Sequence, residues 1–455
     1  MKLKDLNLYH GIALLSLRQK IYFIIAVALL VRLMLFINNP KIFPGDGGAY
    51  HNTAVNLVKG NGYSSLPNAP YDYTVFREPA YPFFLAAIYA PVNIFHKIDY
   101  VNRDILKNTY TGNHPEILIA KIIQILLSSF SIVLIFLTIR IFLEEKFSFL
   151  ISFCVGIYIP YALESSLLLR ECFMNFILIC TNYFFVVQII NGFKIKYVVI
   201  TAILIGISIL NFQANIILIP FYLLLVFFYT KSIIKVAKYG SLTFLLAIGF
   251  TLPWTLFVYS KYPDVRIFKT FGMSFTYEMK LYDEYLEYAY AKKIISQTQL
   301  HQLTDWGELS QIQFDRSFNG VYQKRVDSLS NIINKYTNNE KGLSKNRIEK
   351  YFNYFILSTT GIRISNDYNL SRIIKILLKL SGIIGLIVFF SRTYPMSFVL
   401  SSYLAVSWFI GDEQRRVVII DLFIIVYSLL LFYYLYKSLK SKKLLKPSSI
   451  LIIRH

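Results

Sequence analysis

Long, uninterrupted apolar blocks dominate the sequence and predict its architecture. A helix needs roughly 20 apolar residues to cross a hydrocarbon core about 30 Å thick. The apolar blocks run near 21–38, 117–139, 147–163, 168–190, 197–211, 214–230, 238–259, 374–391, 394–410 and 417–436. Because several of these ten blocks are short and 147–190 could divide differently, the pattern predicts nine to eleven membrane-spanning helices. The expected fold class is an all-α polytopic membrane protein with about ten transmembrane helices and with short helices in its outer-face loops.

Two long polar segments divide the chain into parts. The first, 39–116, is a loop within an N-terminal membrane part that extends over 1–259. The second, 260–373, is expected to form a large loop or a small soluble domain on the same side of the membrane. The C-terminal helices then occupy 374–436, and a basic tail follows over 437–455. No internal repeat is found, and no polar linker separates two halves.

Composition narrows the class of protein further. Only 16% of the residues are charged and 55% are hydrophobic, whereas soluble domains carry about 25% charged residues. This excludes an ordinary cytoplasmic enzyme, a disordered chain and a secreted disulfide scaffold. Cys154, Cys172 and Cys180 fall in apolar blocks and the six histidines show no metal-binding spacing, which predicts neither a disulfide nor a zinc site. The first apolar block leads into Asn-Asn-Pro, so it is expected to be an uncleaved span.

The net charge of +21 is distributed unevenly along the chain. With the N-terminus inside, the inner loops and the tail hold 18 basic and three acidic residues, as the positive-inside rule predicts. These are Lys2, Lys4, Arg18, Lys20, Arg140, Lys146, Lys194, Lys196, Lys231, Lys235, Lys238, Arg392, Lys437, Lys440, Lys442, Lys443, Lys446 and Arg454, against Asp5, Glu144 and Glu145. We therefore expect a multi-pass protein of the plasma (inner) membrane with both termini cytoplasmic. The basic tail is expected to contact membrane lipids, and no nucleic acid partner is expected.

The loop 39–116 holds the first candidate functional residues. A glycine-rich turn, FPGDGG, presents Asp46 at the membrane edge just ahead of a helical pattern, where it could also simply cap that helix. Further along, Arg77 and Glu78 precede an apolar helix that opens with prolines, where a solvated arginine is the simpler interpretation. A carboxylate can act as a general base toward a hydroxyl, and the planar guanidinium suits a phosphate.

Two more charged groups lie at the outer starts of later spans. Arg170 and Glu171 open one apolar helix, with Glu164 shortly before them, and they could be interface charges that snorkel to water. Arg415 and Arg416 open another, where they could hold lipid headgroups. Because the ionisable groups converge on one face of the bilayer, we expect the chemistry there.

Short motifs occur in a fixed order along the chain. An Arg-Leu late in the first span comes first, followed by an Asp with a Tyr four residues further on. Gly-x-Gly-Tyr comes next, and then Arg-Glu directly before Pro-x-Tyr-Pro. An acidic residue at the outer start of a later helix and a Leu-Pro-Trp complete the order. The residues are Arg32, Leu33, Asp46, Tyr50, Gly60, Gly62, Tyr63, Arg77, Glu78, Pro79, Tyr81, Pro82, Glu171, Leu252, Pro253 and Trp254. This order and sidedness resemble the polytopic GT-C glycosyltransferases, in particular protein O-mannosyltransferases and lipid A aminoarabinose transferases. The family also has a late acidic-x-Arg-Tyr pattern, which appears here as Glu413, Gln414, Arg415 and Arg416. The sequence departs from the family at Gly47, where many members have a second acidic residue, and in this late pattern, where Arg or Val replaces the usual Tyr.

The resemblance implies an enzyme that transfers a sugar from a polyprenyl-phosphate donor. The acceptor would be a hydroxyl of a glycan, lipid or protein at the outer face of the membrane. By this resemblance, Asp46 is the base for the acceptor hydroxyl, and Arg415, Arg416 and Arg77 hold the donor phosphate.

The roles of the remaining carboxylates and of a metal stay open. Glu78 and Glu171 would orient the acceptor or share a divalent cation with Asp46, because some members of the superfamily use a metal and others use none. No cofactor is certain. The alternatives from other classes are a polytopic transporter or flippase of lipid-linked or cell-envelope glycans, a polysaccharide polymerase or ligase with a lipid-diphosphate donor, and a membrane-anchored assembly protein that displays 260–373.

Overall fold

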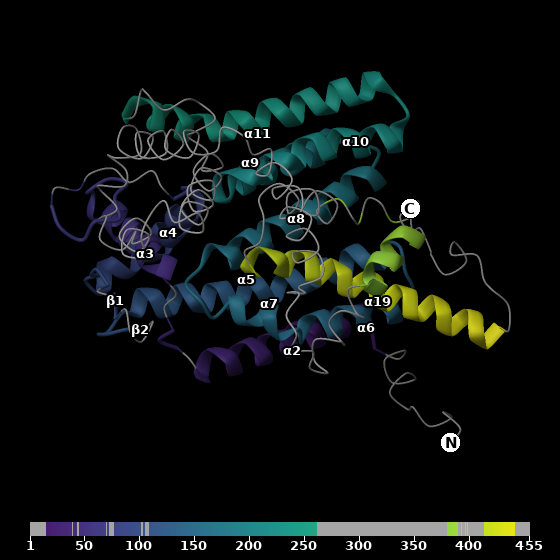
Figure 1. Ribbon diagram of the computed structural model, residues 1–455, viewed down its shortest axis with the longest axis horizontal. Helices are drawn as coiled ribbons and strands as arrows, with labels where there is room; N and C mark the ends of the chain where they lie inside the picture. The colour runs from purple at the N-terminus through teal and green to yellow at the C-terminus, as the bar shows by residue number, and fades with distance from the viewer. Residues whose placement is uncertain are drawn as a thin grey trace, which may run out of the picture.

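The chain folds into a bundle of long helices (Figure 1). The computed structural model describes residues 15–38, 40–42, 45–69, 71, 77–101, 103–104, 109–261, 380–389, 393, 396, 398 and 414–441. Five of the helices in these ranges are long and apolar enough to cross a membrane. They are α2 (Leu17–Asn38), α5 (Pro115–Arg140), α8 (Arg170–Ile190), η2 (Gln213–Ile217) running on into α10 (Leu218–Thr230), and α11 (Ile233–Lys261). The expected all-α polytopic architecture is confirmed.

Shorter apolar helices account for other predicted spans. They are α9 (Ile195–Asn211), a segment over Leu380–Phe389 and α19 (Gln414–Ser441), which includes the apolar stretch Leu422–Ser438. Helix α9 lies against α11 at Gly206, where an added Cβ would stand 2.9 Å from the Cβ of Phe250. A glycine is therefore required for this close approach. The predicted span 394–410 lies outside the described residues, apart from Met396 and Phe398.

The predicted span 147–163 is a broken helix rather than a continuous one. It divides into α6 (Glu145–Gly156) and α7 (Ile159–Glu164), with a proline near the start of α7. The break leaves main-chain carbonyls without helical partners, which is costly inside a membrane. Arg32 of α2 donates from Nη1 to the carbonyl of Gly156 at 3.0 Å and from Nε to Ser128 Oγ of α5 at 2.8 Å. This buried guanidinium therefore ties three helices together at the break.

Charged side chains from distant helices meet at one end of the bundle. Lys20, near the start of α2, forms an ion pair with Glu145 at 2.8 Å, and Arg140, at the end of α5, contacts the same carboxylate at 3.0 Å. Glu144 forms an ion pair with Lys437 of α19 at 3.2 Å. These residues come from the segments predicted to be cytoplasmic, so we call this the inner end and the opposite one the outer end.

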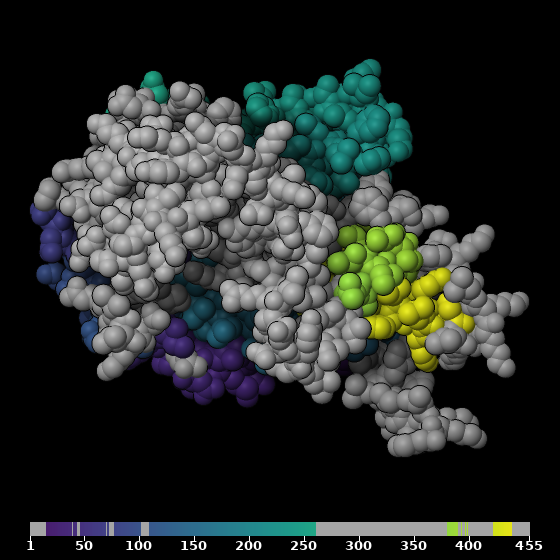
Figure 2. All heavy atoms as spheres, viewed as in Figure 1, coloured from purple at the N-terminus to yellow at the C-terminus, as the bar shows by residue number. Residues whose placement is uncertain are grey.

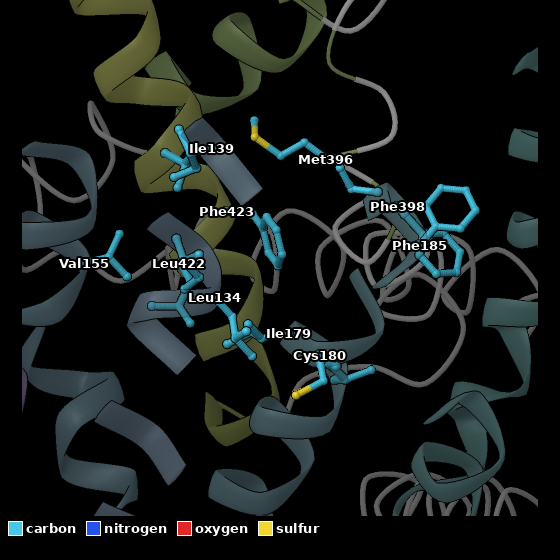
Figure 3. Packing of buried hydrophobic residues seen from close by; sticks show 14 of the residues in the cluster. Leu134, Ile139, Val155, Ile179, Cys180, Phe185, Met396, Phe398, Leu422 and Phe423 are labelled. Atoms are coloured by element: carbon cyan, nitrogen blue, oxygen red, sulfur yellow. The ribbon is translucent and has the colours of Figure 1, made fainter. Parts of the chain in front are cut away.

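Apolar side chains fill the space between the helices. In Figure 3, side chains of α5, α6, α8 and α19 meet in one cluster, and Phe185 lies against Phe398 with ring centroids 4.5 Å apart. All three cysteines are free thiols; Cys172 and Cys180 are buried and Cys154 is half-buried. Many large apolar side chains on the bundle surface are exposed, which suits contact with lipid. Figure 2 shows α2 (purple) and the hairpin of α10 and α11 (teal) at opposite edges of one face.

The segment between the first two spans forms a small outer domain. It holds α3 (Gly45–Lys59), α4 (Ala80–Phe95) and the antiparallel hairpin of β1 (Arg103–Asp104) and β2 (Thr109–Tyr110). A separate core, which includes the buried rings of Tyr50, Tyr81, Tyr89 and Tyr110, joins α3 and α4 to the start of α5. Short helices were expected in this loop and are confirmed, whereas the hairpin was not expected. This domain lies at the outer end, against the first turns of α5 and α8.

Candidate functional site

Asp46 forms an ion pair with Arg77 at the outer end of the bundle. The guanidinium Nη2 lies 2.8 Å from Asp46 Oδ1, and the side chains remain 20% (Arg77) and 34% (Asp46) exposed. Asp46 lies in the first turn of α3, which begins at Gly45, so Gly47 and Gly48 belong to the helix and not to the predicted turn. A carboxylate in the first turn is stabilised by the helix dipole. Because both side chains are partly exposed, the pair remains in contact with solvent, where a substrate can reach it.

Tyr63 holds the main chain that carries Arg77 and Glu78. Its hydroxyl donates to the carbonyl of Arg77 at 2.9 Å and lies 3.2 Å from that of Glu78. Gly60 and Gly62 have φ angles of +78° and +86°, which L side chains rarely adopt, and they let the chain reverse after α3 so that Tyr63 reaches this position. The Gly-x-Gly-Tyr motif thus has a local structural explanation: it positions the next motif along the chain.

A second ion pair connects the outer domain to the membrane helices. Arg170, the first residue of α8, forms an ion pair from Nη1 with Glu78 Oε2, and both side chains are largely buried. The same nitrogen donates to the carbonyl of Asn211 at 3.3 Å, and the guanidinium lies 5.0 Å from the ring centre of Phe212. Arg170 is therefore fixed from several sides. The interpretation of Arg170 as a snorkelling interface charge does not fit this buried pairing.

Tyr50 is a buried residue beside the Asp46–Arg77 pair. Its ring centre lies 5.4 Å from the Cζ of Arg77, and its ring packs edge-on against Tyr81 with centroids 5.0 Å apart. Burial raises the pKa of Tyr50 to about 12, and the nearby carboxylates of Glu171 and Glu78 add to the shift while the two arginines oppose it. Tyr50 thus remains a neutral phenol. Because Arg77, Glu78, Arg170 and Glu171 all influence the pKa of this one hydroxyl, they lie around the same region.

Glu171 completes the cluster next to Arg170 in the first turn of α8. Its side chain is buried, and its Oε2 has no hydrogen-bond partner among the described residues. A buried carboxylate oxygen without a partner costs free energy unless a cation or a donor reaches it. Glu164, which precedes it, is also buried and accepts a hydrogen bond from Asn175 Nδ2 at 2.7 Å.

The structure thus brings together four of the six residues that the sequence singled out: Asp46, Arg77, Glu78 and Glu171. Arg415 and Arg416 lie in the first turn of α19, and their side chains fall outside the described residues. Arg170 is the cluster member that the sequence interpretation did not select, although its position next to Glu171 at a helix start was a signal. The two arginines and three carboxylates described in the cluster sum to 2 − 3 = −1.

The outer end of α11 reaches the same region. Trp254, from the Leu-Pro-Trp motif, packs edge-on against Tyr63 with ring centroids 4.6 Å apart. This contact gives the tryptophan of the motif a structural role. It links the outer end of a membrane helix to the tyrosine that holds the Arg77–Glu78 main chain.

Comparison with known proteins finds similarity at the level of structure. The sequence matches no family model and no curated protein. The archaeal oligosaccharyltransferase AglB from Archaeoglobus fulgidus, in complex with an inhibitory peptide and a dolichol-phosphate, is similar with a TM-score of 0.47 and 14% identity over 93% of this chain and 52% of AglB. ArnT from Cupriavidus metallidurans, bound to undecaprenyl phosphate, is similar with a TM-score of 0.38 and 11% identity over 90% of this chain and 78% of ArnT. The chain spans about half the length of the oligosaccharyltransferase. Both are GT-C superfamily glycosyltransferases, the class that the motifs of this sequence resemble.

Proposed function

We propose that this protein is a membrane glycosyltransferase that transfers a sugar from a polyprenyl-phosphate donor to an acceptor hydroxyl. The observation that supports this most is the cluster of Asp46, Arg77, Glu78, Arg170 and Glu171, which three separate parts of the chain build at the outer end of the bundle. Carboxylates can serve as bases, and guanidinium groups are suited to phosphate. A membrane-embedded donor would present its head group at this depth.

The proposed reaction needs one base and several positive charges. Asp46 accepts the proton of the acceptor hydroxyl while the acceptor oxygen forms a bond to the anomeric carbon of the sugar. The bond from that carbon to the phosphate oxygen breaks, and polyprenyl phosphate leaves with the electron pair. Arginines placed beforehand stabilise the negative charge that develops on the leaving phosphate.

The ion pair of Asp46 with Arg77 suggests an order of binding. A carboxylate beside a guanidinium is stabilised in its charged form and is a weak base. The donor phosphate would compete with Asp46 for Arg77, so donor binding would release the carboxylate toward the acceptor. We therefore propose that the donor binds before the acceptor is deprotonated.

Additional positive charge is needed before this cluster can hold an anionic donor, because its described members sum to −1. We propose that Arg415 and Arg416, in the first turn of α19, supply it. A divalent cation shared by Asp46, Glu78 and Glu171 is the alternative. It would also give the Oε2 of Glu171 a partner.

The membrane setting of the proposal follows from the chain's own charges. The inner end of the bundle gathers Lys20, Arg140 and Lys437, and we propose that it faces the cytoplasm of a plasma (inner) membrane, with both termini on that side. AglB and ArnT were solved with dolichol-phosphate and undecaprenyl phosphate, respectively, which belong to the proposed donor class. The acceptor is proposed as a glycan, lipid or protein hydroxyl.

The test is transfer of labelled sugar by the purified protein. Wild-type protein incubated with labelled polyprenyl-phosphate sugars and membrane extract is expected to move the label to an acceptor, and Asp46→Asn is expected to abolish this while the protein still folds. Asp99→Asn is the matched control, because Asp99 lies in the same outer domain with its side chain 71% exposed. Absence of transfer from every donor, or full transfer by Asp46→Asn, would refute the proposal.

A transporter or flippase is the second candidate, and the break between α6 and α7 favours it. Broken helices at membrane depth are common in transporters, where they form substrate sites. Here, however, the break is filled by Arg32 of the protein itself. Uptake of a lipid-linked glycan into vesicles that survives Asp46→Asn would support the transporter.

A further inference from the structure

Three buried side chains in the outer domain form a group of metal-ligating type away from the Asp46 cluster. We propose that His51, His114 and Glu116 bind a divalent transition-metal ion of the zinc class. Each offers one ligand atom, and these atoms all lie within 4.8 Å of one another. The relative exposures are 0% for His51, 8% for His114 and 0% for Glu116, so the group is shielded from solvent. Imidazole nitrogen and carboxylate oxygen are the ligands that zinc takes in proteins.

The two histidines have the tautomer that a metal requires. His51 Nε2 lies 2.9 Å from the carbonyl of Asp99, and His114 Nε2 lies 3.0 Å from that of Thr111. A carbonyl oxygen only accepts, so both Nε2 atoms carry hydrogen, and in the neutral rings Nδ1 holds the lone pair. Metal-binding histidines are oriented in this way, with the second nitrogen donating to a carbonyl or carboxylate.

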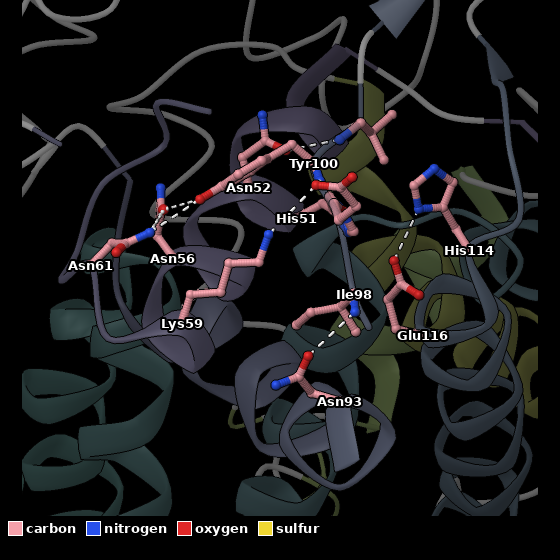
Figure 4. A network of polar contacts seen from close by, with 12 residues as sticks. His51, Asn52, Asn56, Lys59, Asn61, Asn93, Ile98, Tyr100, His114 and Glu116 are labelled. Atoms are coloured by element: carbon pink, nitrogen blue, oxygen red, sulfur yellow. Dashed lines mark hydrogen bonds and ion pairs between the residues drawn. The ribbon is translucent and has the colours of Figure 1, made fainter. Parts of the chain in front are cut away.

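The contact between His114 and Glu116 needs either a proton or a metal ion between its two atoms. Figure 4 shows the contact between the two side chains. His114 Nδ1 lies 3.0 Å from Glu116 Oε1, and a neutral ring with its hydrogen on Nε2 and an ionised carboxylate would meet there as two acceptors. Glu116 Oε2 is buried and has no hydrogen-bond partner among the described residues. A proton would satisfy one of these oxygens, whereas a divalent cation would engage the ring nitrogen and the carboxylate together. The proton is therefore the competing occupant that an experiment must distinguish from a metal.

His51 can join the site through a small rearrangement. Its Nδ1 lies 3.0 Å from the hydroxyl of Tyr89, a neutral partner that a metal can replace or retain. The rings of His51 and His114 are 5.8 Å apart and nearly perpendicular, at 87°. Two ligands on a tetrahedral zinc lie roughly 3.4 Å apart when each bond is about 2.05 Å. Because the three ligand atoms already lie within 4.8 Å of one another, they would have to approach by at most about 1.4 Å to contact one ion.

The position of the site indicates what the metal would do. His51 lies in α3, five residues after Asp46, while His114 and Glu116 lie at the start of α5. A metal would therefore connect the helix that carries Asp46 to the bundle, in addition to the aromatic contacts. Since this role is structural, metal binding can be measured without any sugar transfer.

The test uses the purified full chain and Zn²⁺ or Co²⁺ alone. After EDTA treatment and dialysis, titration is expected to load about one Zn²⁺ per chain, raise the melting temperature, and give Co²⁺-loaded protein the visible absorption of a tetrahedral site. Glu116→Gln and His51→Gln are each expected to weaken binding at least about tenfold. His96→Gln is the matched control, because His96 is exposed at the end of α4 and is expected to leave binding unchanged.

Two results would overturn the proposal. One is wild-type protein that binds no more Zn²⁺ than His51→Gln, which would leave the proton as the occupant. The other is equal weakening by His96→Gln, which would place the ion elsewhere. Should the buried-site variants fail to fold, the Co²⁺ spectrum of wild-type protein decides alone: no tetrahedral absorption, or absorption that Zn²⁺ does not displace, contradicts the site.

Discussion

Arg32 offers the sharpest test of how the broken helix is tolerated. Its guanidinium is buried in α2 and donates hydrogen bonds to Ser128 Oγ at 2.8 Å, to the carbonyl of Ala28 at 3.0 Å and to the carbonyl of Gly156 at 3.0 Å. Its Cζ also lies 5.2 Å from the ring centre of Tyr161 in α7. Replacing it with methionine keeps an unbranched side chain and removes every donor. We expect Arg32→Met to destabilise the bundle rather than to change a reacting group.

The size of the effect follows from the groups left behind. A hydrogen bond to a charged donor contributes about 1.5–3 kcal/mol, and an orphaned buried acceptor costs about 1–3 kcal/mol. Only the Gly156 carbonyl and Ser128 lose a partner on another helix, which limits the loss of stability. Removing the buried charge also recovers part of the free energy that its desolvation costs, and this reduces the loss further. We therefore expect a net loss of about 3 kcal/mol, which is roughly a hundredfold change in the unfolding equilibrium.

Denaturation of purified protein in mixed micelles, followed by circular dichroism, measures this loss. Arg18→Met is the matched control, because Arg18 is an exposed arginine on the same helix and its loss is expected to change stability by less than about 0.5 kcal/mol. The reasoning is refuted if Arg32→Met is as stable as wild type. It is also refuted if both variants lose stability equally, because the effect would then come from general charge removal.

Two further outcomes follow from the outer cluster. Tyr63→Phe removes the hydroxyl that contacts the carbonyls of Arg77 and Glu78, so kcat/KM for sugar transfer should fall roughly fivefold to tenfold. Tyr22→Phe, on the exposed face of α2, should stay near wild type, and an equal fall in both would remove the positioning role. Because burial raises the pKa of Tyr50 to about 12, the stability contributed by its neutral hydroxyl is fully present below pH 10, the ordinary pKa of tyrosine, and is lost as the pH rises through about 12. Melting curves over this range should show about 2–3 kcal/mol less loss for Tyr50→Phe, and parallel curves would contradict the assignment.

The hydrophobic pattern predicts most of the helical framework because membrane helices are selected by local composition. Spans near 21–38, 117–139 and 168–190 correspond closely to α2, α5 and α8. The break within 147–163 was not predicted, since hydropathy counts apolar residues and does not register a carbonyl that a distant side chain can satisfy. Arg32 shows the reason: a lone arginine in a span indicates a buried partner, but that partner lies 124 residues along the chain.

The residues of the candidate site could be predicted from local sequence, whereas the pairing between them could not. Asp46, Arg77, Glu78 and Glu171 could be predicted because each lies in or just before the first turn of a helix, and helix starts on one face of a membrane lie at similar depth. Their pairing could not be predicted, because Arg170 meets Glu78 across 92 residues through the packing of the outer domain on α8.

The proposed metal site, like the Arg170–Glu78 pair, could not be predicted from local sequence. Metal motifs are recognised in sequence when a helix or a turn presents two ligands at a short fixed spacing, and His51 and His114 have no such spacing. They meet because the aromatic core of the outer domain packs α3 against the first turn of α5. The polar chemistry of this protein thus depends on which helix ends the outer domain brings together. Changes in that small core should therefore disturb the Asp46 cluster and the histidine site together, while the membrane helices remain folded.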